Sequence, residues 1–351
     1  MIEASAPIRI CDNGGWTDTW FGGPGRVLNI AVGPGVEVSI RSSGGPDPVV
    51  IDAATFGDRY PVVPGAPRAA RHPLLEAAVD ALPPPQDRPV EISVRSAVPA
   101  GCGAGTSAAV AVALLGALAA ARGEELSPRQ AAYAAHRLEV GVLGAQSGIQ
   151  DQLSAAFGGI NYLEIDHYPE ATVHPLPPWG TLDSRLSLVF LGRAHDSSGL
   201  HRRVIEGATE QRTGVLSRLR EAAVAARDAV IAQDLGAFGR SMIANTEAQA
   251  ALDPELVGVD AWRVIETASV GAASVGAASV GAASVGAASV GAAIGWKVNG
   301  AGGDGGSLTL LSRTREAKES LDSLVANLDA RYRVLPFQVS RFGLRVHGAL
   351  G

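Results

Sequence analysis

One glycine-rich segment constrains the fold of this chain more than any other feature of its sequence. It reads Pro99-Ala100-Gly101-Cys102-Gly103-Ala104-Gly105-Thr106-Ser107-Ala108-Ala109. Residues 90–95 before it alternate between apolar and polar side chains, as in a strand, and the apolar run after it is typical of a buried helix. Glycines let backbone N–H groups face a ligand, and the start of a helix favours an anion. We therefore predict a phosphate site here; a plain glycine-rich turn is the alternative.

Two common nucleotide-binding motifs do not fit this segment. A P-loop ends in Gly-Lys-Ser/Thr, and the only lysines of the chain are Lys297 and Lys318. A dinucleotide-binding fingerprint has the spacing GxGxxG, whereas Gly101, Gly103 and Gly105 are spaced GxGxG. Both motifs are excluded.

The length and element pattern indicate two domains. A chain of 351 residues is long for one compact domain, so two domains sharing a cleft are expected. The proline-rich segment 174–180 is the best candidate for the junction, which gives domains at 1–180 and 181–351. Strands are predicted at 36–41, 90–95, 160–165, 186–191, 308–312 and 343–346, and helices at 74–82, from 108 onward, at 129–143, within 207–252 and at 314–331. This mixture favours an α+β fold over a regular βαβ succession.

Residues 268–292 are five perfect copies of Ala-Ser-Val-Gly-Ala. A period of five matches neither the helical period of 3.6 nor the strand period of 2, so it gives no fixed apolar stripe. We interpret the tract as a tandem expansion or a sequence anomaly within a helix that leads to Gly295, and no function can be assigned to it.

The charge and cysteine content exclude several classes of protein. A net charge of -6 argues against a general binder of nucleic acid or membrane surfaces. Cys11 and Cys102 provide neither a disulfide framework nor metal-ligand spacing, so we expect two small buried residues. The first residues lack a signal-peptide pattern, and the longest apolar stretch, 108–121, is too short to span a bilayer. We expect a cytoplasmic protein with a small-molecule partner; a homodimer is left open.

The glycine-rich segment resembles the second motif of GHMP kinases, P-x-x-x-G-L-G-S-S-A. Two further segments are similar to the other motifs of that family. Residues 6–18, with Ala-Pro-Ile-Arg-Ile and Gly-Gly-Trp-Thr-Asp, resemble the first motif in its sugar-kinase form, and residues 297–306 resemble the third, glycine-rich motif. The chain departs from the family at Ala104, which replaces Leu, at Thr106, which replaces Ser, and at Asn299, which replaces Thr or Ser.

The resemblance implies a fold, two cofactors and their binding residues. The implied fold is a two-domain α+β structure, with a ribosomal protein S5-like N-terminal domain, a ferredoxin-like C-terminal α/β sandwich and the active site in the cleft between them. ATP and Mg²⁺ are the implied cofactors. The residues implied to bind ATP are Gly101, Gly103, Ala104, Gly105, Thr106, Ser107, Gly300, Gly302 and Gly303.

Phosphoryl transfer requires charge neutralisation, a metal ion and an oriented hydroxyl group. Glu139 and Asp151 are twelve residues apart on successive elements, which brings two carboxylates toward one point. By resemblance, Ser107 and Glu139 hold Mg²⁺, Asp151 takes the proton of the substrate hydroxyl, and Arg9 lies beside Asp151 and keeps its pKa low. For Glu139 alone, a solvated helix residue is the alternative.

The first motif also carries the residues implied to bind the sugar. By resemblance, Asp18 contacts substrate hydroxyls, with Gly15, Trp16 and Thr17 around it; a turn residue and a core tryptophan are the alternatives for Asp18 and Trp16. Together with the sequence at 150–162, this motif is similar to D-glycero-D-manno-heptose 7-phosphate kinases, with L-fucokinases close behind.

The resemblance predicts phosphorylation of the anomeric hydroxyl of the heptose phosphate, with another monosaccharide 1-kinase as the alternative. Arg193, Arg202 and Arg203 are candidates to hold the substrate's own phosphate. An inactive nucleotide or sugar sensor is the alternative from another class, and a carbohydrate-binding module is disfavoured because two glycine-rich anion sites are present.

Overall fold

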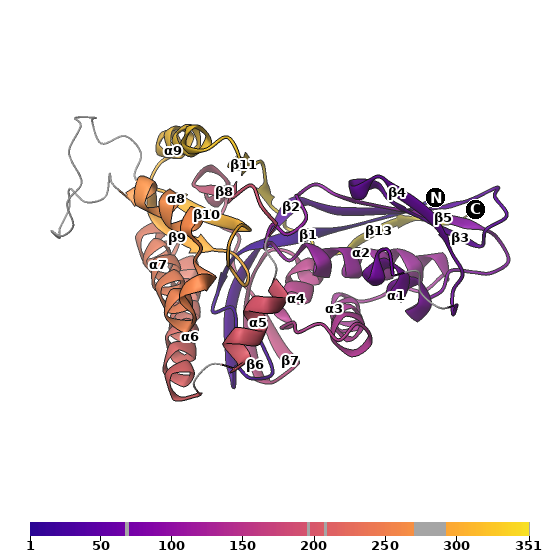
Figure 1. Ribbon diagram of the computed structural model, residues 1–351, viewed down its shortest axis with the longest axis horizontal. Helices are drawn as coiled ribbons and strands as arrows, with labels where there is room; N and C mark the ends of the chain where they lie inside the picture. Colours follow the sequence, from indigo (N-terminus) through magenta and orange to yellow (C-terminus); the bar gives the residue numbers. More distant parts are fainter. Residues whose placement is uncertain (67–69, 195–196, 207–208, 270–292, 351) are drawn as a thin grey trace.

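Two long antiparallel strands, β1 (Ile2–Asn13) and β2 (Gly25–Ser42), run along most of the molecule (Figure 1). The computed structural model describes residues 1–66, 70–194, 197–206, 209–269 and 293–350. Residues 2–5 of β1 alternate between buried and more exposed positions, whereas residues 8–13 are all buried. The reason is that four helices contact β1, namely α2 (Thr106–Ala121), α4 (Gln150–Phe157), α6 (Thr209–Ala232) and α7 (Leu235–Leu252). The second half of β1 therefore lies in the interior of the molecule, where it can carry site residues.

β1 and β2 belong to a nine-stranded sheet with the path β13-β1-β2-β5-β3-β4, in which β6 and β12 also pair with β2, and β7 pairs with β6. All its pairings are antiparallel except that of β3 with β5. Its other strands are β3 (Val49–Ala53), β4 (Asp58–Val62), β5 (Val90–Ser96), β6 (Ile160–His167), β7 (Glu170–Pro175), β12 (Gln338–Val339) and β13 (Arg345–Gly348). The strands predicted at 36–41, 90–95, 160–165 and 343–346 all lie in this sheet.

Helices pack against this sheet around one central helix, α2 (Thr106–Ala121). Twelve of its sixteen residues are buried, as expected for a helix that is apolar on all sides. Its neighbours are α1 (Pro73–Ala81), α3 (Pro128–His136) and α4 (Gln150–Phe157). The helix predicted at 129–143 begins at Pro128, behind a Ser127 capping box, and continues as a π-helix, η2 (Arg137–Val142).

The second lobe contains a four-stranded antiparallel sheet in the order β11-β8-β10-β9. Its strands are β8 (Leu186–Phe190), β9 (Ala293–Val298), β10 (Ser307–Ser312) and β11 (Arg333–Leu335). The helices of this half of the chain are α5 (Ser197–Glu206), α6 (Thr209–Ala232), α7 (Leu235–Leu252), α8 (Val259–Ser269) and α9 (Arg315–Leu328). The described chain also contains the short 3-10 helices η1 (Ala54–Phe56), η3 (Leu182–Ser184) and η4 (Pro254–Leu256). A separate apolar core lies between this sheet and α8 and α9. The predicted α+β class is confirmed.

The last strands of the chain return to the first sheet, so the two lobes are not simply the two halves of the sequence. Strands β12 and β13 pair with β2 and β1, so residues 338–339 and 345–348 lie in the sheet of the first lobe. Both chain ends lie at the same end of the molecule in Figure 1. The division at 180/181 stays a prediction, with the qualification that these last strands belong with the first sheet.

The repeat tract falls largely outside the described residues, which resume at 293. The helix expected over the tract is described only at residues 268–269, which end helix α8 (Val259–Ser269), and the rest of that prediction lies outside the described residues. Gly295 lies in strand β9, which pairs with β10. Cys11 and Cys102 are buried free thiols, as predicted.

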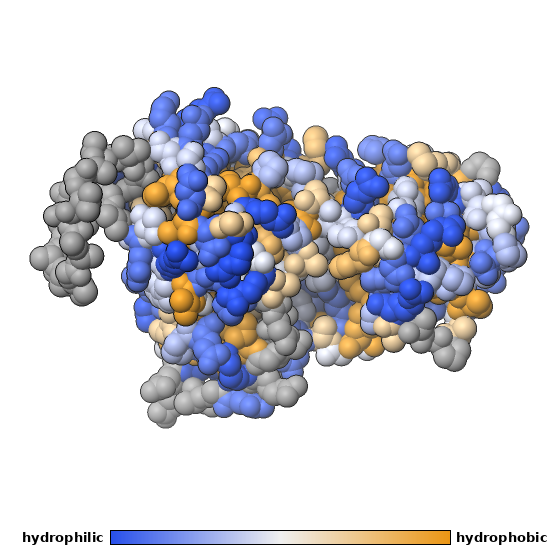
Figure 2. Space-filling model, turned by 45° about the horizontal axis from the view of Figure 1, so that its top comes forward, coloured by the Kyte–Doolittle hydropathy of each residue, from blue (hydrophilic) through white to orange (hydrophobic). Residues whose placement is uncertain are grey.

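The surface mixes hydrophilic and hydrophobic residues on the face shown in Figure 2. Among the helices described, none combines the length and the apolar character needed to cross a bilayer.

The contact between α7 and β9 requires a glycine. A Cβ atom added to Gly239 would lie 2.2 Å from the carbonyl oxygen of Ile294. We expect Gly239→Ala to lower the free energy of unfolding by about 1–3 kcal/mol, because the helix must move off the strand. Gly214→Ala is the matched control, since nothing lies within 4 Å of its added Cβ and it is also helical. Urea unfolding measures both variants; equal stability of the two would contradict this packing.

Candidate active site

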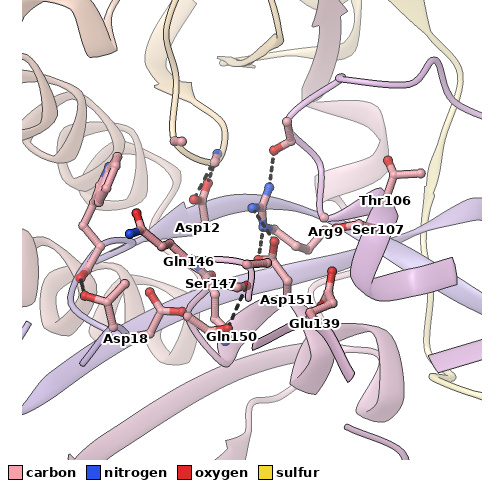
Figure 3. A pocket seen from close by; sticks show the side chains of 18 of the residues that line it. Arg9, Asp12, Asp18, Thr106, Ser107, Glu139, Gln146, Ser147, Gln150 and Asp151 are labelled. Carbon is pink, nitrogen blue, oxygen red and sulfur yellow. Dashed lines mark hydrogen bonds and ion pairs between the residues drawn. The ribbon is translucent and has the colours of Figure 1, made fainter. Parts of the chain in front are cut away.

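A cavity of about 340 Å³ lies where the three predicted motifs meet (Figure 3). Its lining comes from β1 and the turn after it, from the glycine-rich loop before α2, from η2, α4 and the loop between them, and from residues 300–301. Segments that are nearly 300 residues apart in sequence therefore form one site.

An ion pair between Arg9 and Asp151 lies at the centre of this cavity. Arg9 Nε lies 2.8 Å from Asp151 Oδ1, and Nη2 lies 3.0 Å from Oδ2. The third guanidinium nitrogen, Nη1, donates to the carbonyl oxygen of Gly103, and the backbone N–H of Arg9 donates to Ala104 at 3.0 Å. Burial alone would lower the pKa of Arg9, but the attraction of Asp151 and Asp12 outweighs it and raises the pKa. The guanidinium thus fixes Asp151 against the glycine-rich loop.

The glycine-rich loop approaches this ion pair closely. Gly105 has φ +68°, and a Cβ atom added to it would lie 3.2 Å from the carboxylate of Asp151 and 3.3 Å from Arg9 Cγ. Gly105 is also the residue before α2, and no side chain caps the helix there. Next to it, the hydroxyl oxygen of Thr106 is buried without a hydrogen-bond partner. An uncapped helix start beside an unpaired hydroxyl group suits a phosphate group.

The third motif is held to β1 by a second buried ion pair, which the sequence analysis did not identify. Lys297 Nζ lies 3.2 Å from Asp12 Oδ1, and each side chain is 1% exposed. Asp12 also accepts from the backbone N–H of Gly300 at 3.0 Å. Burial lowers the pKa of Lys297, and Asp12 opposes this shift. The sequence signal was present, since Lys297 is one of two lysines in the chain and Asp12 lies inside the first motif.

The three glycines predicted in the third motif differ in position. Gly300 lines the cavity, whereas Gly302 and Gly303 do not. An added Cβ at Gly302 would lie 1.9 Å from the carbonyl oxygen of Leu256, and Gly303 N–H donates to the same oxygen at 2.8 Å. These two glycines let the loop pack against Leu256.

Ser107, at the start of α2, and Glu139, on η2, both line the cavity. Glu139 is 6% exposed on the π-helix η2 and accepts a hydrogen bond from Gln152 Nε2. Burial raises the pKa of Glu139, and hydrogen bonds from Gln152 and Ser107 offset part of the shift. Within the described residues, no group of three or more His, Cys, Asp or Glu side chains could hold a metal ion. One carboxylate and one hydroxyl group do fit Mg²⁺, which keeps several waters and takes further oxygens from substrate phosphates.

The residues predicted to bind sugar divide into two pairs. Asp18 and Trp16 line the cavity, whereas Gly15 and Thr17 do not. The hydroxyl group of Thr17 donates to Gly14 at 2.7 Å and accepts from Arg26 N–H at 3.1 Å, so it stabilises the turn. Trp16 is 6% exposed and packs in a small apolar cluster with residues of α5, α6 and α7.

Asp18 contributes a carboxylate group to the cavity lining. It is 2% exposed and accepts from the backbone N–H of Gln150 at 3.1 Å. Burial raises its pKa to about 7. Gln150 and Ser147 also line the cavity beside it, and the sequence analysis did not assign either of them to the site.

A second cavity of about 320 Å³ adjoins the first and shares Gly101, Thr106 and Ser107 with it. Its other walls are mostly apolar and come from η1, α1, α2 and β5. Phe56 and His72 lie on it with ring centroids 5.2 Å apart. The arrangement is a polar cavity and an apolar cavity that meet at the glycine-rich loop.

Comparison with known proteins supports the resemblance to GHMP kinases. Residues 69–159 match the family model of the GHMP kinases N terminal domain. The chain is 42% identical over 88 residues to mevalonate kinase of Thermococcus sibiricus, which is 25% of this chain and 26% of the relative. It is 40% identical over 74 residues to L-arabinokinase of Arabidopsis thaliana, which is 21% of this chain and 7% of the relative. The matches therefore span about a quarter or less of these relatives.

The fold comparison extends over the whole chain. A crystal structure described as a D-glycero-D-manno-heptose 1-phosphate kinase from Bacteriodes thetaiotaomicron has a TM-score of 0.75 and 21% identity, and covers 100% of both chains. At this identity the likeness concerns the fold. Residues 69–159 thus match the GHMP kinases N terminal domain, and the whole chain shares its fold with a structure described as a sugar phosphate kinase, which confirms the resemblance.

The buried pair of Lys297 and Asp12 gives a stability prediction. We expect Lys297→Met to lower the free energy of unfolding by about 3–5 kcal/mol, because Asp12 would keep a buried charge without its partner. Adding Asp12→Asn should recover part of this loss, since the unpaired charge is then removed. Urea unfolding of both variants measures the effect. If the Lys297→Met variant were as stable as the wild type, the pair would not be what holds the third motif.

Proposed function

We propose that this chain, which carries a GHMP kinase N-terminal domain, is an ATP-dependent kinase that transfers the γ-phosphate to a hydroxyl group of a sugar or sugar phosphate. The observation that supports this most is the position of Asp151. Its carboxylate is fixed by Arg9 and lies against Gly105, at the start of a helix suited to phosphate. A proton acceptor beside a phosphate-binding loop is the arrangement that phosphoryl transfer to a hydroxyl group needs.

The two adjoining cavities divide the substrates between them. The apolar cavity offers a surface for the nucleoside of ATP, with Phe56 and His72 at its wall. The glycine-rich loop then receives the phosphates, because Gly101, Thr106 and Ser107 line both cavities. The polar cavity receives the acceptor hydroxyl.

The proposed residue roles follow from these positions. Ser107 and Glu139 would hold Mg²⁺, which supplies charge neutralisation on the phosphate oxygens when bound. Asp151 accepts the proton of the acceptor hydroxyl as that oxygen bonds to the γ-phosphorus. The bond from the γ-phosphorus to the bridging oxygen of ADP breaks, so the products are a sugar phosphate, ADP and one proton. Arg9 keeps Asp151 oriented and balances negative charge.

The identity of the acceptor is a finer proposal. The first motif and residues 150–162 favour the anomeric hydroxyl of D-glycero-D-manno-heptose 7-phosphate, with an L-fucokinase or another monosaccharide 1-kinase as the alternative. A structure with the same fold is described as a heptose 1-phosphate kinase, and together with the match to an L-arabinokinase it supports a sugar acceptor. The match to mevalonate kinase supports a kinase reaction in general and does not bear on which acceptor is used.

ADP release with MgATP and a panel of sugars tests this function. We expect turnover on at least one sugar, and Asp151→Asn should lower kcat by about 10²- to 10⁴-fold because the proton acceptor is lost. Asp166→Asn is the matched control, since Asp166 is exposed on β6 and pairs with Arg26. ATP binding without ADP release in the wild-type chain would favour the sensor, and full activity of Asp151→Asn would remove Asp151 from the mechanism.

A further inference from the structure

Asp18, Thr19, Ser147 and Gln150 line the polar cavity, and Figure 3 shows Asp18 on the side of the cavity away from Thr106 and Ser107. Three of these four groups offer no hydrogen-bond donor to a ligand. The Asp18 carboxylate carries no proton, and the hydroxyl protons of Thr19 and Ser147 are donated to the backbone. The hydroxyl group of Thr19 donates to the carbonyl oxygen of Trp16 at 2.7 Å, and that of Ser147 donates to Gly148 at 3.0 Å. Both hydroxyl groups therefore present lone pairs rather than protons to a ligand.

Gln150 and Asp18 add further acceptors to the cavity lining. Gln150 is 5% exposed, and its side-chain oxygen Oε1 is buried without a hydrogen-bond partner. Asp18 is held in place by the backbone N–H of Gln150 and has no ion pair within the described part of the chain. A buried acceptor without a donor costs free energy, so this wall favours a ligand that brings hydrogen-bond donors.

The charges around the cavity point the same way. Four carboxylates line it, from Asp12, Asp18, Glu139 and Asp151. Asp12 is paired with Lys297, and Asp151 with Arg9, the one Arg or Lys among the lining residues that the structure describes. Among the side chains that the structure describes, no free cation lies on the cavity beside the Asp18 carboxylate, and like charges in contact cost several kcal/mol.

The arginines considered for a substrate phosphate are engaged elsewhere. Arg193 pairs with Asp260 at 2.8 Å and with Asp304 at 3.2 Å. Arg203 pairs with Asp253 at 3.4 Å and with Glu255. Neither lines the cavity, and the side chain of Arg202 lies outside the described residues.

We propose that the acceptor substrate is an uncharged sugar, whose hydroxyl groups donate to Asp18, Gln150, Thr19 and Ser147. The phosphate transfer to this sugar rests on the proposed kinase function, whereas its binding does not. This choice favours the neutral monosaccharide alternative over the heptose 7-phosphate that the sequence motifs favour. It also sets the chain apart from a carboxylate acceptor such as mevalonate.

Matched pairs of ligands test this proposal by calorimetry on the full chain at pH 8 with Mg²⁺ and the non-hydrolysable ATP analogue AMP-PNP. The pairs are D-mannose with its 6-phosphate and D-glycero-D-manno-heptose with its 7-phosphate; L-fucose, L-arabinose, D-galactose and R-mevalonate complete the panel. We expect a neutral sugar to bind, and the sugar phosphates and mevalonate to bind at least about 100-fold more weakly. Tighter binding of a sugar phosphate or of mevalonate, or binding of no neutral sugar, would overturn the proposal.

Two variants separate hydrogen bonding from charge. A Cβ atom added to Gly148 would lie 1.9 Å from Asp18 Oδ2, so Gly148→Ala should displace the carboxylate and weaken sugar binding by about tenfold or more. Gly180→Ala is the control, since nothing lies within 4 Å of its added Cβ. Retained AMP-PNP binding shows that each variant is folded. Asp18→Asn should narrow the difference in binding affinity between a sugar and its phosphate. An unchanged difference in affinity would contradict the role given to Asp18.

ADP release, measured on the same ligands with MgATP in place of AMP-PNP, distinguishes failure of this inference from failure of the proposed kinase function. Binding of a neutral sugar without ADP release would support this inference and contradict the kinase. Turnover on a sugar phosphate alone would support the kinase and overturn this inference.

Discussion

The ion pair of the buried Arg9 with the partly buried Asp151 is the interaction on which the rest of the site depends. It joins a strand, the start of a helix and a glycine-rich loop, because the same guanidinium also binds the carbonyl oxygen of Gly103. A buried charge must be fully paired, so the backbone has to come close on every side. That requirement explains Gly105, and also Gly300, where an added Cβ atom would lie 2.6 Å from Gly103 O.

A second buried pair, Lys297 with Asp12, extends this arrangement to the other lobe. It ties β9 and the third motif to β1, so the loop that closes the cavity is fixed by strand pairing on one side and by charge on the other. Arg9 and Asp12 both line the cavity from the same short stretch of β1, in which residues 8–13 are all buried. The site is thus assembled by long-range contacts rather than by any one segment.

The sequence predicted the local parts of this structure better than the long-range ones. Helix α2 and the loop before it follow from local composition, and Arg9, Ser107, Glu139 and Asp151 do line one cavity. Strand β1 was not predicted, because residues 8–13 are buried on both faces and therefore lack alternation. Strand β12 is too short to show a pattern. A strand was predicted at 343–346, which overlaps β13, but its pairing with β1 was not, because the two strands lie hundreds of residues apart. Likewise, the rarity of lysine singles out Lys297, but no local signal shows that it meets Asp12 or that Trp16 lies in an apolar cluster.

A crystal structure of the chain with Mg²⁺, AMP-PNP and a neutral sugar would test the central claim most directly. We expect the γ-phosphate at the start of α2 and a sugar hydroxyl within hydrogen-bond reach of Asp151, about 2.6–3.2 Å. Arg9 should still bind Asp151 in this complex. A nucleotide bound away from residues 101–107, or a sugar hydroxyl far from Asp151, would contradict this claim.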